Sequence, residues 1–434
     1  MKEEKITIII GAGASTPFYN NELTTSYLTK DALFNKSIWQ KLLKMFNNYK
    51  KDGSRNLQKL RIDINDVFFI LGKIYHILKK SQRFKNVNFE YIIHLLDKIS
   101  NYLYSEINVE YANIDEYLID FWHICDSQLI QYAFKNSDKA GWKYVPFLGR
   151  EVIATAILEL WESNTSKDSI NINKDFFSSL LKQFKSVNIY SLNYDPLLYE
   201  SLKDIKDFVH GFVGNIFDSS VFYKADNVIA FVHGHVGFEP YQNQMKFNSN
   251  YNNAQENRIK GLFDAIITNR TKYWTFGMKG IHYNTYLVTG LDKIDAFSLN
   301  PFASYIHRFG KDIIESSYII LIGLSLIDYH LNAFLTNSLF ISDKRIIFVT
   351  KSDVDTIIDK LSEGRYSLIH KLWTLFKDAV SLNINYEEDP FKKHRENLRK
   401  SLSQNGFGKL TDHIVLYIKG VENFYKEKNL IWDS

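Results

Sequence analysis

Runs of consecutive apolar residues recur along this chain and predict strands that are buried on both faces. Each run is followed by glycine, proline or short polar residues, and then by a helix-like pattern. Strands that alternate with helices in this way indicate an α/β fold with a largely parallel sheet and helices on both faces. The runs cover residues 5–10, 187–192, 227–233, 317–324 and 344–350.

The chain between the first two runs has a different, helical periodicity. Residues 64–80, 89–104 and 150–163 carry apolar side chains at three- and four-residue spacing, which is typical of amphipathic helices. In the second of these segments the apolar positions are Phe89, Ile92, Ile93, Leu96, Ile99 and Leu103. The stretch 239–257 is largely polar and rich in asparagine, so we predict a mobile loop there.

These patterns predict how the chain is organised. We expect one α/β domain over residues 1–350, with a large helical insertion at 35–185. The remaining residues, 351–434, are expected to form a mainly helical C-terminal extension packed on that domain. No linker rich in proline, glycine or serine marks the edges of the insertion, which favours a single domain over two.

Composition and charge exclude several classes of protein. Apolar residues make up 45% of the chain, which fits a folded protein rather than a disordered one. The net charge of +4 is small, so we expect no direct binding of nucleic acid, and the basic run Lys392–Lys400 is interpreted as a solvated helix face. Cys125 is the only cysteine, which excludes a disulfide framework and a cysteine-rich zinc site. The amino-terminal residues lack signal-peptide features and no apolar run is long enough to span a membrane, so we expect a cytoplasmic protein with no membrane partner.

A glycine-rich turn follows the first strand. Gly11, Ala12, Gly13 and Ser15 are small enough to let backbone N–H groups approach a ligand phosphate, as at the start of a dinucleotide-binding turn. This favours a Rossmann-like sheet that holds a phosphate. Thr16 stands where the third glycine of such a motif is expected, so an ordinary tight turn is the alternative.

Short polar side chains also end the strand at 187–192. Asp195 and Pro196 are explained as the N-cap and the first residue of the next helix. Asn193 is not explained by that cap, and its amide can both donate and accept hydrogen bonds at the strand end.

Two further strand ends carry candidate chemistry. His233 follows the strand at 227–233 and is suited to act as a general base, although a histidine that only hydrogen-bonds in a turn explains it as well. Gly323 and Ser325 follow the strand at 317–324 and can contact a ribose or phosphate. Ser325 and Asp328 also fit a helix capping box, and both interpretations can hold together.

The four motifs in this order, GAGAS, NYD, HG and GLSLID, resemble the sirtuin-like (silent information regulator) superfamily over roughly residues 5 to 350. The resemblance is closer to bacterial NAD-hydrolysing anti-phage effectors than to the protein deacylases. It implies that Asn193 and His233 are the catalytic pair. It also implies that Gly11, Ala12, Gly13 and Ser15 hold the NAD pyrophosphate, that Asp195 organises the nicotinamide end, and that Gly323 and Ser325 contact the adenosine side.

The resemblance predicts an NAD glycohydrolase that releases nicotinamide and ADP-ribose in abortive-infection defence, with NAD as substrate and no metal. An off state is expected, from which activity is released by homo-oligomerisation, by an operon-encoded regulatory partner or by a nucleotide signal. The alternatives are an NAD- or ADP-ribose-binding module without hydrolysis, and a deacylase or ADP-ribosyltransferase. A single cysteine and the sequence of Thr16–Leu23, which differs from the deacylase loop, both disfavour deacylation.

Overall fold

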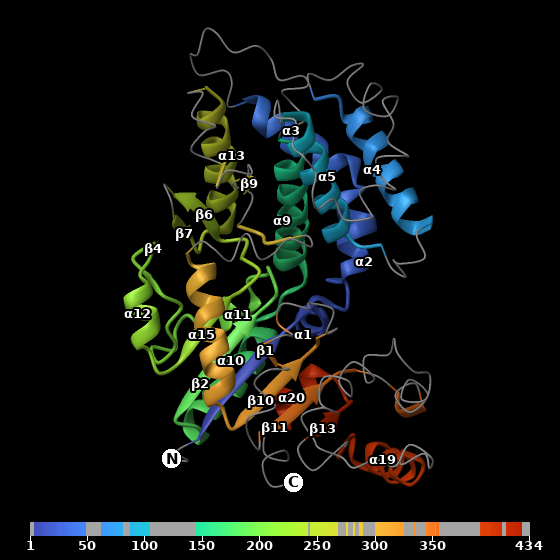
Figure 1. Ribbon diagram of the computed structural model, residues 1–434, viewed down its shortest axis with the longest axis vertical. Coiled ribbons are helices and arrows are strands. Elements are labelled where there is room, and N and C mark those ends of the chain that lie inside the picture. The colour runs from blue at the N-terminus through green and yellow to red at the C-terminus, as the bar shows by residue number, and fades with distance from the viewer. Residues whose placement is uncertain are drawn as a thin grey trace. The chain divides into compact units, whose positions relative to one another are not determined.

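The chain forms two compact units in the computed structural model (Figure 1). Unit 1 comprises Met1–Leu23, Leu160–His235 and Phe297–Ser434, and unit 2 comprises Thr24–Glu159 and Val236–Ala296. The structure describes residues 4–48, 62–80, 87–104, 144–241, 244–267, 275–276, 281–282, 286–289, 300–324, 331, 334–335, 344–351, 353–355, 391–409 and 414–427. Among the described residues, no helix has the length and apolar character that crossing a bilayer requires.

Unit 1 is built on a seven-stranded sheet with the order β12-β13-β11-β10-β1-β2-β5. All neighbouring pairs are parallel except β12 with β13. The α/β fold and largely parallel sheet predicted from the apolar runs are therefore confirmed. The strands are β1 (Lys5–Ile10), β2 (Ser186–Ser191), β5 (Val228–Phe231), β10 (Tyr318–Ile322), β11 (Arg345–Val349), β12 (Phe407–Lys409) and β13 (Ile414–Tyr417), and a separate hairpin joins β3 (Phe212–Val213) to β4 (Ile216–Phe217).

Helices cover both faces of this sheet. In β2 the ring of Tyr190 packs against Phe309 of α15 (Phe302–Glu315), with 4.9 Å between ring centroids. The next residue, Ser191, faces the opposite way along the strand and lines a cavity with Asn173 of α10 (Lys167–Gln183). The other helices of unit 1 are α1 (Ala12–Ser15), η1 (Thr16–Tyr19), α11 (Leu197–Leu202), α12 (Ser219–Lys224), α19 (Phe391–Asn405) and α20 (Val421–Lys426).

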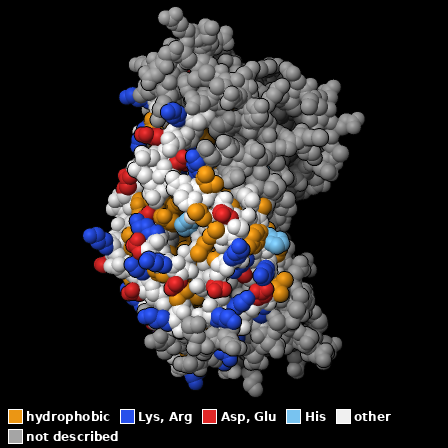
Figure 2. Space-filling view, turned by 90° about the vertical axis from the view of Figure 1, so that its left-hand side faces the viewer, with side chains coloured by type: hydrophobic (Ala, Val, Ile, Leu, Met, Phe, Trp, Pro, Cys, Tyr) orange, Lys and Arg blue, Asp and Glu red, His pale blue; other side chains and the backbone are white. Residues whose placement is uncertain are grey.

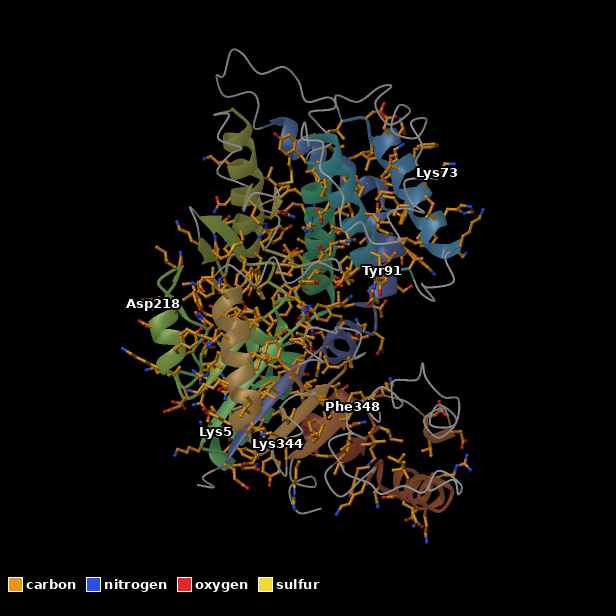
Figure 3. The ribbon with its side chains drawn as sticks, in the orientation of Figure 1. Lys5, Lys73, Tyr91, Asp218, Lys344 and Phe348 are labelled. Atoms are coloured by element: carbon orange, nitrogen blue, oxygen red, sulfur yellow. The ribbon has the colours of Figure 1, made fainter. Side chains whose placement is uncertain are left out.

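The amino ends of the strands are tied to the end of α15. Lys5 of β1 forms an ion pair with Glu315 at 2.6 Å. Lys344, just before β11, donates hydrogen bonds to the carbonyl oxygens of Ile314 at 2.6 Å and Ser316 at 2.7 Å, so it satisfies backbone acceptors at the helix end. Figure 3 shows Lys5 and Lys344 at this end of the sheet, opposite the edge where the predicted motifs lie.

Unit 2 is mainly helical. The helices predicted over 64–80 and 89–104 are confirmed with those bounds, and the one over 150–163 lies inside a longer helix. The elements are α2 (Thr25–Tyr27), η2 (Leu28–Leu33), α3 (Lys36–Asn48), α4 (Ile64–Lys80), α5 (Phe89–Tyr104), α9 (Val145–Asn164, ending in unit 1), α13 (Tyr251–Ile267), and the hairpin strands β6 (Phe238–Tyr241), β7 (Gln244–Phe247), β8 (Thr275–Phe276) and β9 (Ile281–His282).

Two segments differ from their predicted structure. The stretch 239–257 is not a loop, because it forms most of β6, all of β7 and the start of α13. Its asparagines act as local caps, since the side chain of Asn250 accepts the backbone N–H of Asn253 at the helix start. The C-terminal extension also supplies two strands, β12 and β13, to the sheet.

Whether residues 35–185 are a helical insertion into one domain stays a prediction. In the structure α10, from the last part of that range, belongs to unit 1, and the earlier helices belong to unit 2.

Figure 2 shows one face of the molecule, on which lysines and arginines alternate with acidic side chains over the described area.

Candidate active site

The predicted motifs meet at the carboxyl edge of the parallel sheet. Ile10 at the end of β1 is in register with Ser191 of β2 and with Ile322 of β10. Ser191 is in turn in register with Phe231 of β5. Val349 of β11 continues the row beyond Ile322. The strands therefore end together, and the residues that follow them are neighbours, as at the ligand-binding edge of open α/β sheets.

Asn193 and His233 occupy equivalent places on neighbouring strand ends. Each lies two positions after one of the paired residues Ser191 and Phe231. The backbone N–H of Val232 donates to the carbonyl oxygen of Ser191 at 2.9 Å, so pairing continues past the strands. Adjacent strands lie about 4.8 Å apart, so Asn193 and His233 follow neighbouring strands at the same edge of the sheet.

The glycines of the first turn pack against the end of β10. Gly11 donates to the carbonyl oxygen of Ile322 at 2.8 Å, and Gly13 donates to that of Gly323 at 3.1 Å. A Cβ on Gly11 would lie 2.7 Å from that Gly323 oxygen, and a Cβ on Gly323 would lie 2.2 Å from the Ala14 nitrogen. Because Gly11 and Gly323 have no side chains, the two backbones can approach this closely. The N–H groups of Gly11 and Gly13, which were expected to face a phosphate, donate to backbone carbonyl oxygens within the fold.

The outer side of this turn is Ala12 and Gly13, which are exposed, whereas Ser15 is buried. Ser325, predicted to meet the adenosine side, and Asp328 of the capping box lie outside the described residues. The contacts predicted between the turn and a pyrophosphate stay predictions.

Asn193 is held through both its backbone and its side chain. Its backbone N–H donates to the Ser191 hydroxyl at 3.1 Å, and its side-chain Nδ2 donates to Ser15 Oγ at 2.8 Å. The residue is only 7% exposed. Its Oδ1 is buried and has no hydrogen-bond partner among the described residues. A buried acceptor left without a donor is costly, so Oδ1 is suited to receive a donor from a ligand.

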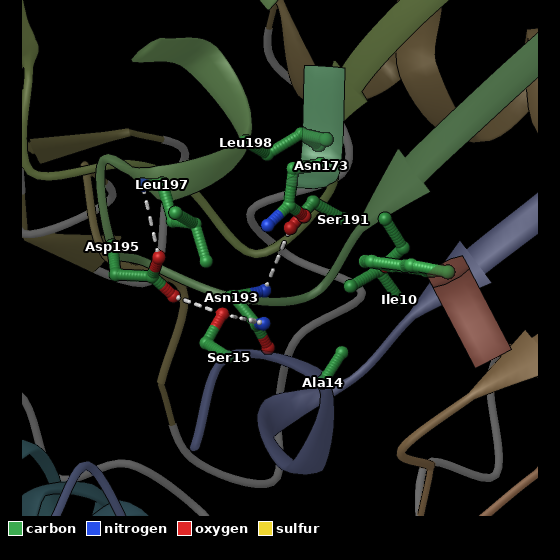
Figure 4. Close-up of a pocket in the computed structure, with 10 residues that line it drawn as sticks. Ile10, Ala14, Ser15, Asn173, Ser191, Asn193, Asp195, Leu197 and Leu198 are labelled. Atoms are coloured by element: carbon green, nitrogen blue, oxygen red, sulfur yellow. Dashed lines mark hydrogen bonds between the residues drawn. The ribbon is translucent and has the colours of Figure 1, made fainter. Parts of the chain in front are cut away.

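Asp195 is the acceptor that organises this cluster (Figure 4). Its Oδ2 accepts from the Ser15 hydroxyl at 2.8 Å, and its Oδ1 accepts from the Tyr19 hydroxyl and the Leu197 N–H, both at 3.1 Å. Burial raises the pKa of Asp195 above its ordinary value of 3.8, and the three donors oppose that rise. The helix begins at Leu197, one residue later than predicted, because Pro196 is the N-cap; Asp195 still accepts the N–H of the first helical residue.

Proton counting fixes which way the Asn193 amide points. A serine hydroxyl has one hydrogen, and the Ser15 hydroxyl gives it to Asp195. Ser15 Oγ can therefore only accept from Asn193, so Nδ2 faces Ser15 and Oδ1 faces away. In the structure the Ser15 hydroxyl joins Asn193 to Asp195, and its predicted contact with the pyrophosphate stays a prediction.

A small cavity with room for about one water molecule, partly open to solvent, adjoins this cluster. Its walls combine the polar groups of Ser15, Ser191, Asn193 and Asp195 with apolar side chains. Sequence reasoning missed Asn173 of α10 and Tyr425 of α20, because both lie in helices whose pattern indicates only burial. The lining residues are Ile10, Ala14, Ser15, Asn173, Ser191, Asn193, Asp195, Leu197, Leu198 and Tyr425.

His233 lies outside that cavity lining, although it is only 4% exposed. The chain turns sharply behind it, since Gly234 has a φ of +95° and donates to the carbonyl oxygen of Phe231 at 3.0 Å. His235 is fully buried, with its ring 4.6 Å from that of Phe231, so it belongs to the core. The structure thus gathers Asn193, Ser15 and Asp195 around one cavity and places His233 beside them on the sheet edge.

Among the described residues, no group of three or more His, Cys, Asp or Glu side chains is placed to hold a metal ion. No protein-family model matches the chain, and no curated protein gives a significant match.

Proposed function

We propose that this protein is an NAD glycohydrolase with its active site at the carboxyl edge of the sheet. The observation that carries the proposal is Asn193, whose amide is held by Ser15 so that a buried acceptor oxygen is left for a ligand. A ribose hydroxyl or a water molecule provides the missing donor. The order of the four strand-end motifs, which resembles sirtuin-like enzymes, supports NAD as the substrate.

The reaction breaks the bond between ribose C1′ and the pyridinium nitrogen of nicotinamide. The electron pair of that bond goes to the nitrogen, so nicotinamide leaves as a neutral molecule. Water forms the new bond to C1′ and gives ADP-ribose, and its proton passes to a base. Because the nicotinamide ring of NAD carries a positive charge, it is a good leaving group. The protein therefore lowers the reaction barrier mainly by orienting the ribose and the water.

Each residue then has a stated role. Asn193 Oδ1 accepts from the ribose hydroxyl or water and orients it. Ser15 and Asp195 hold that amide, and His233 takes the proton, a role worth about 10²–10⁴-fold in rate. We assign Ala12 and Gly13 on the exposed side of the turn, with Gly11 and Gly323 behind it, to the pyrophosphate and adenosine side of a Rossmann-like site. Ser325 keeps its predicted contact with the adenosine side.

The cellular role follows from the same resemblance. An enzyme that depletes NAD on infection is suited to abortive anti-phage defence, with release from an off state by self-assembly or by an operon-encoded partner.

The test is to follow nicotinamide release from NAD by purified protein, alone and with the product of each neighbouring gene. We expect release by wild type under at least one condition. Asn193→Ala should lose about 10²-fold or more in kcat, because its contact orients the reacting groups. His233→Ala should lose about 10²–10⁴-fold.

Matched controls are Asn405→Ala at the exposed end of α19 and His307→Ala on the exposed side of α15, which should keep wild-type rates. Absence of nicotinamide release in every condition, with ADP-ribose or NAD still bound, would establish the alternative of a binding module. Equal rates for the site and control variants would refute the site assignment.

A further inference from the structure

Helix α20, near the C-terminus, is anchored firmly to the sheet of unit 1. It follows β13, which pairs in parallel with β11. Thr350 after β11 donates to the carbonyl oxygen of Tyr417 at 2.9 Å and accepts from the N–H of Gly420 at 3.0 Å. These two hydrogen bonds fix where α20 begins and which side chains it turns toward the sheet.

The ring of Tyr425 lies between two elements that belong to the amino-terminal half of the chain. It stacks on Phe176 of α10, with ring centroids 4.3 Å apart and planes inclined by 19°. It also stacks in near-parallel fashion with Phe18 of η1, at 6.1 Å and 17°. Tyr425 is 3% exposed and lines the cavity beside Asn193.

Phe18 connects this stack to the hydrogen-bonded cluster. It lies in η1, between Ser15 and Tyr19, and both of those residues donate to Asp195. A shift of Phe18 would therefore move both donors, and with Ser15 the partner that holds the Asn193 amide. Close-packed rings transmit such shifts because they leave little room to adjust.

We propose that Tyr425 is a positioning residue for the active site, and that α20 is therefore part of the catalytic unit. This inference rests on the proposed function of Asn193. The ring of Tyr425, rather than its hydroxyl, does the work, because the two stacking contacts are made by the ring.

Phe424 provides a matched comparison in the same helix. It is fully buried and contacts Phe176 at 5.5 Å, Tyr417 of β13 at 5.2 Å and the neighbouring Tyr425 at 6.3 Å between ring centroids. It does not line the cavity. Truncation of Phe424 thus removes a buried ring from the same helix and leaves the direct ring contact between Tyr425 and Phe18 in place.

The experiment compares Tyr425→Phe, Tyr425→Leu and Phe424→Leu with wild type. We measure kcat and KM for nicotinamide release, thermal unfolding, and hydrogen exchange of the peptide over residues 11–23. Tyr425→Phe should keep kcat within about twofold. Tyr425→Leu should lose between about tenfold and a hundredfold in kcat with KM nearly unchanged, because misplacement of an orienting group acts on the reacting geometry.

Hydrogen exchange separates this inference from the proposed function, since it needs no activity. Residues 11–23 should exchange faster in Tyr425→Leu than in wild type, and at the wild-type rate in Phe424→Leu, although both variants lower the melting temperature. A wild type without nicotinamide release would refute the proposed function alone. Equal kcat or equal exchange in the two leucine variants, or a kcat loss in Tyr425→Phe as large as that in Tyr425→Leu, would overturn the positioning role.

Discussion

Asp195 shows how burial and hydrogen bonding compete at a single carboxyl group. Burial raises its pKa, while Ser15, Leu197 and Tyr19 donate to it and lower its pKa. The ionised carboxylate has no hydrogen of its own and accepts from all three donors. Protonated Asp195 would carry an O–H that can donate to Ser15. Ser15 would then no longer have to give its hydrogen to Asp195 and accept from Asn193. The orientation of the Asn193 amide therefore depends on the charge of Asp195.

This dependence predicts an acidic limit to nicotinamide release. As pH falls through the raised pKa of Asp195, the rate should fall, at a pH above the ordinary carboxyl value of 3.8. Tyr19→Phe removes one donor that lowers this pKa, so the acidic limb should move to higher pH. The pH profile of kcat measures the shift.

Tyr417→Phe is the control for that profile, because its hydroxyl also donates to a carboxylate, that of Glu427, but at a distance from the cluster. Its acidic limb should coincide with that of wild type. A Tyr19→Phe profile that coincides with wild type, or moves to lower pH, would contradict the role given to Asp195.

Among the elements, the contact between the glycine turn and the end of β10 tolerates no added atom. Gly323 combines a φ of +61° with a Cβ position 2.2 Å from the Ala14 nitrogen. Gly214, in the hairpin between β3 and β4, has a φ of +62° and nothing within 4 Å of its Cβ position. The two glycines share a backbone conformation that would strain an alanine, and they differ in how closely other atoms pack around them.

Gly323→Ala should therefore destabilise the protein far more than Gly214→Ala. The left-handed conformation alone costs an alanine about 1–2 kcal/mol, and Gly323→Ala must also displace the turn that leads to Ser15. Thermal unfolding and nicotinamide release measure both effects. We expect loss of activity for Gly323→Ala and wild-type activity for Gly214→Ala; similar behaviour of the two would show that strain alone matters.

The apolar runs predicted five of the seven strands of the sheet, because a buried parallel strand needs a continuous apolar stretch. The run at 414–418 carries the same signal for β13, but it lies inside a segment that was predicted to be mainly helical. The partnership of Ser15 with Asn193 could not be read from local pattern, since 178 residues separate them. The asparagines near 250 were misread because an N-cap and a loop use the same residue type.

At the scale of the whole molecule, unit 2 has its own polar centre. Arg258 of α13 is fully buried and pairs with Glu151 of α9, with its Nε at 2.7 Å and its NH2 nitrogen at 3.1 Å from the two carboxylate oxygens. It also donates to the carbonyl oxygens of Val236 and Phe238, and its guanidinium lies 4.1 Å from the ring centroid of Tyr286. This ion pair joins segments far apart in the sequence of unit 2.

Loss of one member of this pair leaves a buried charge without its partner. Glu151→Gln should lower the free energy of unfolding of unit 2 by about 3–5 kcal/mol. The double variant Glu151→Met with Arg258→Met should recover most of that loss, because apolar side chains of similar size replace both charges. Calorimetric unfolding checks the order; a double variant less stable than Glu151→Gln would contradict it.

The contribution of α20 to the cavity wall also bears on the order in which the site is synthesised. Ser15 and Tyr425 line one cavity, yet 410 positions (425 − 15) separate them in the chain. A ribosome adds about 5–20 residues per second, so roughly 20–80 s pass between their synthesis. A nascent chain carries Asn193 and His233 long before α20 can complete the cavity. With α20 as part of the proposed catalytic unit, we expect the nascent chain to gain full activity only once Tyr425 has been added.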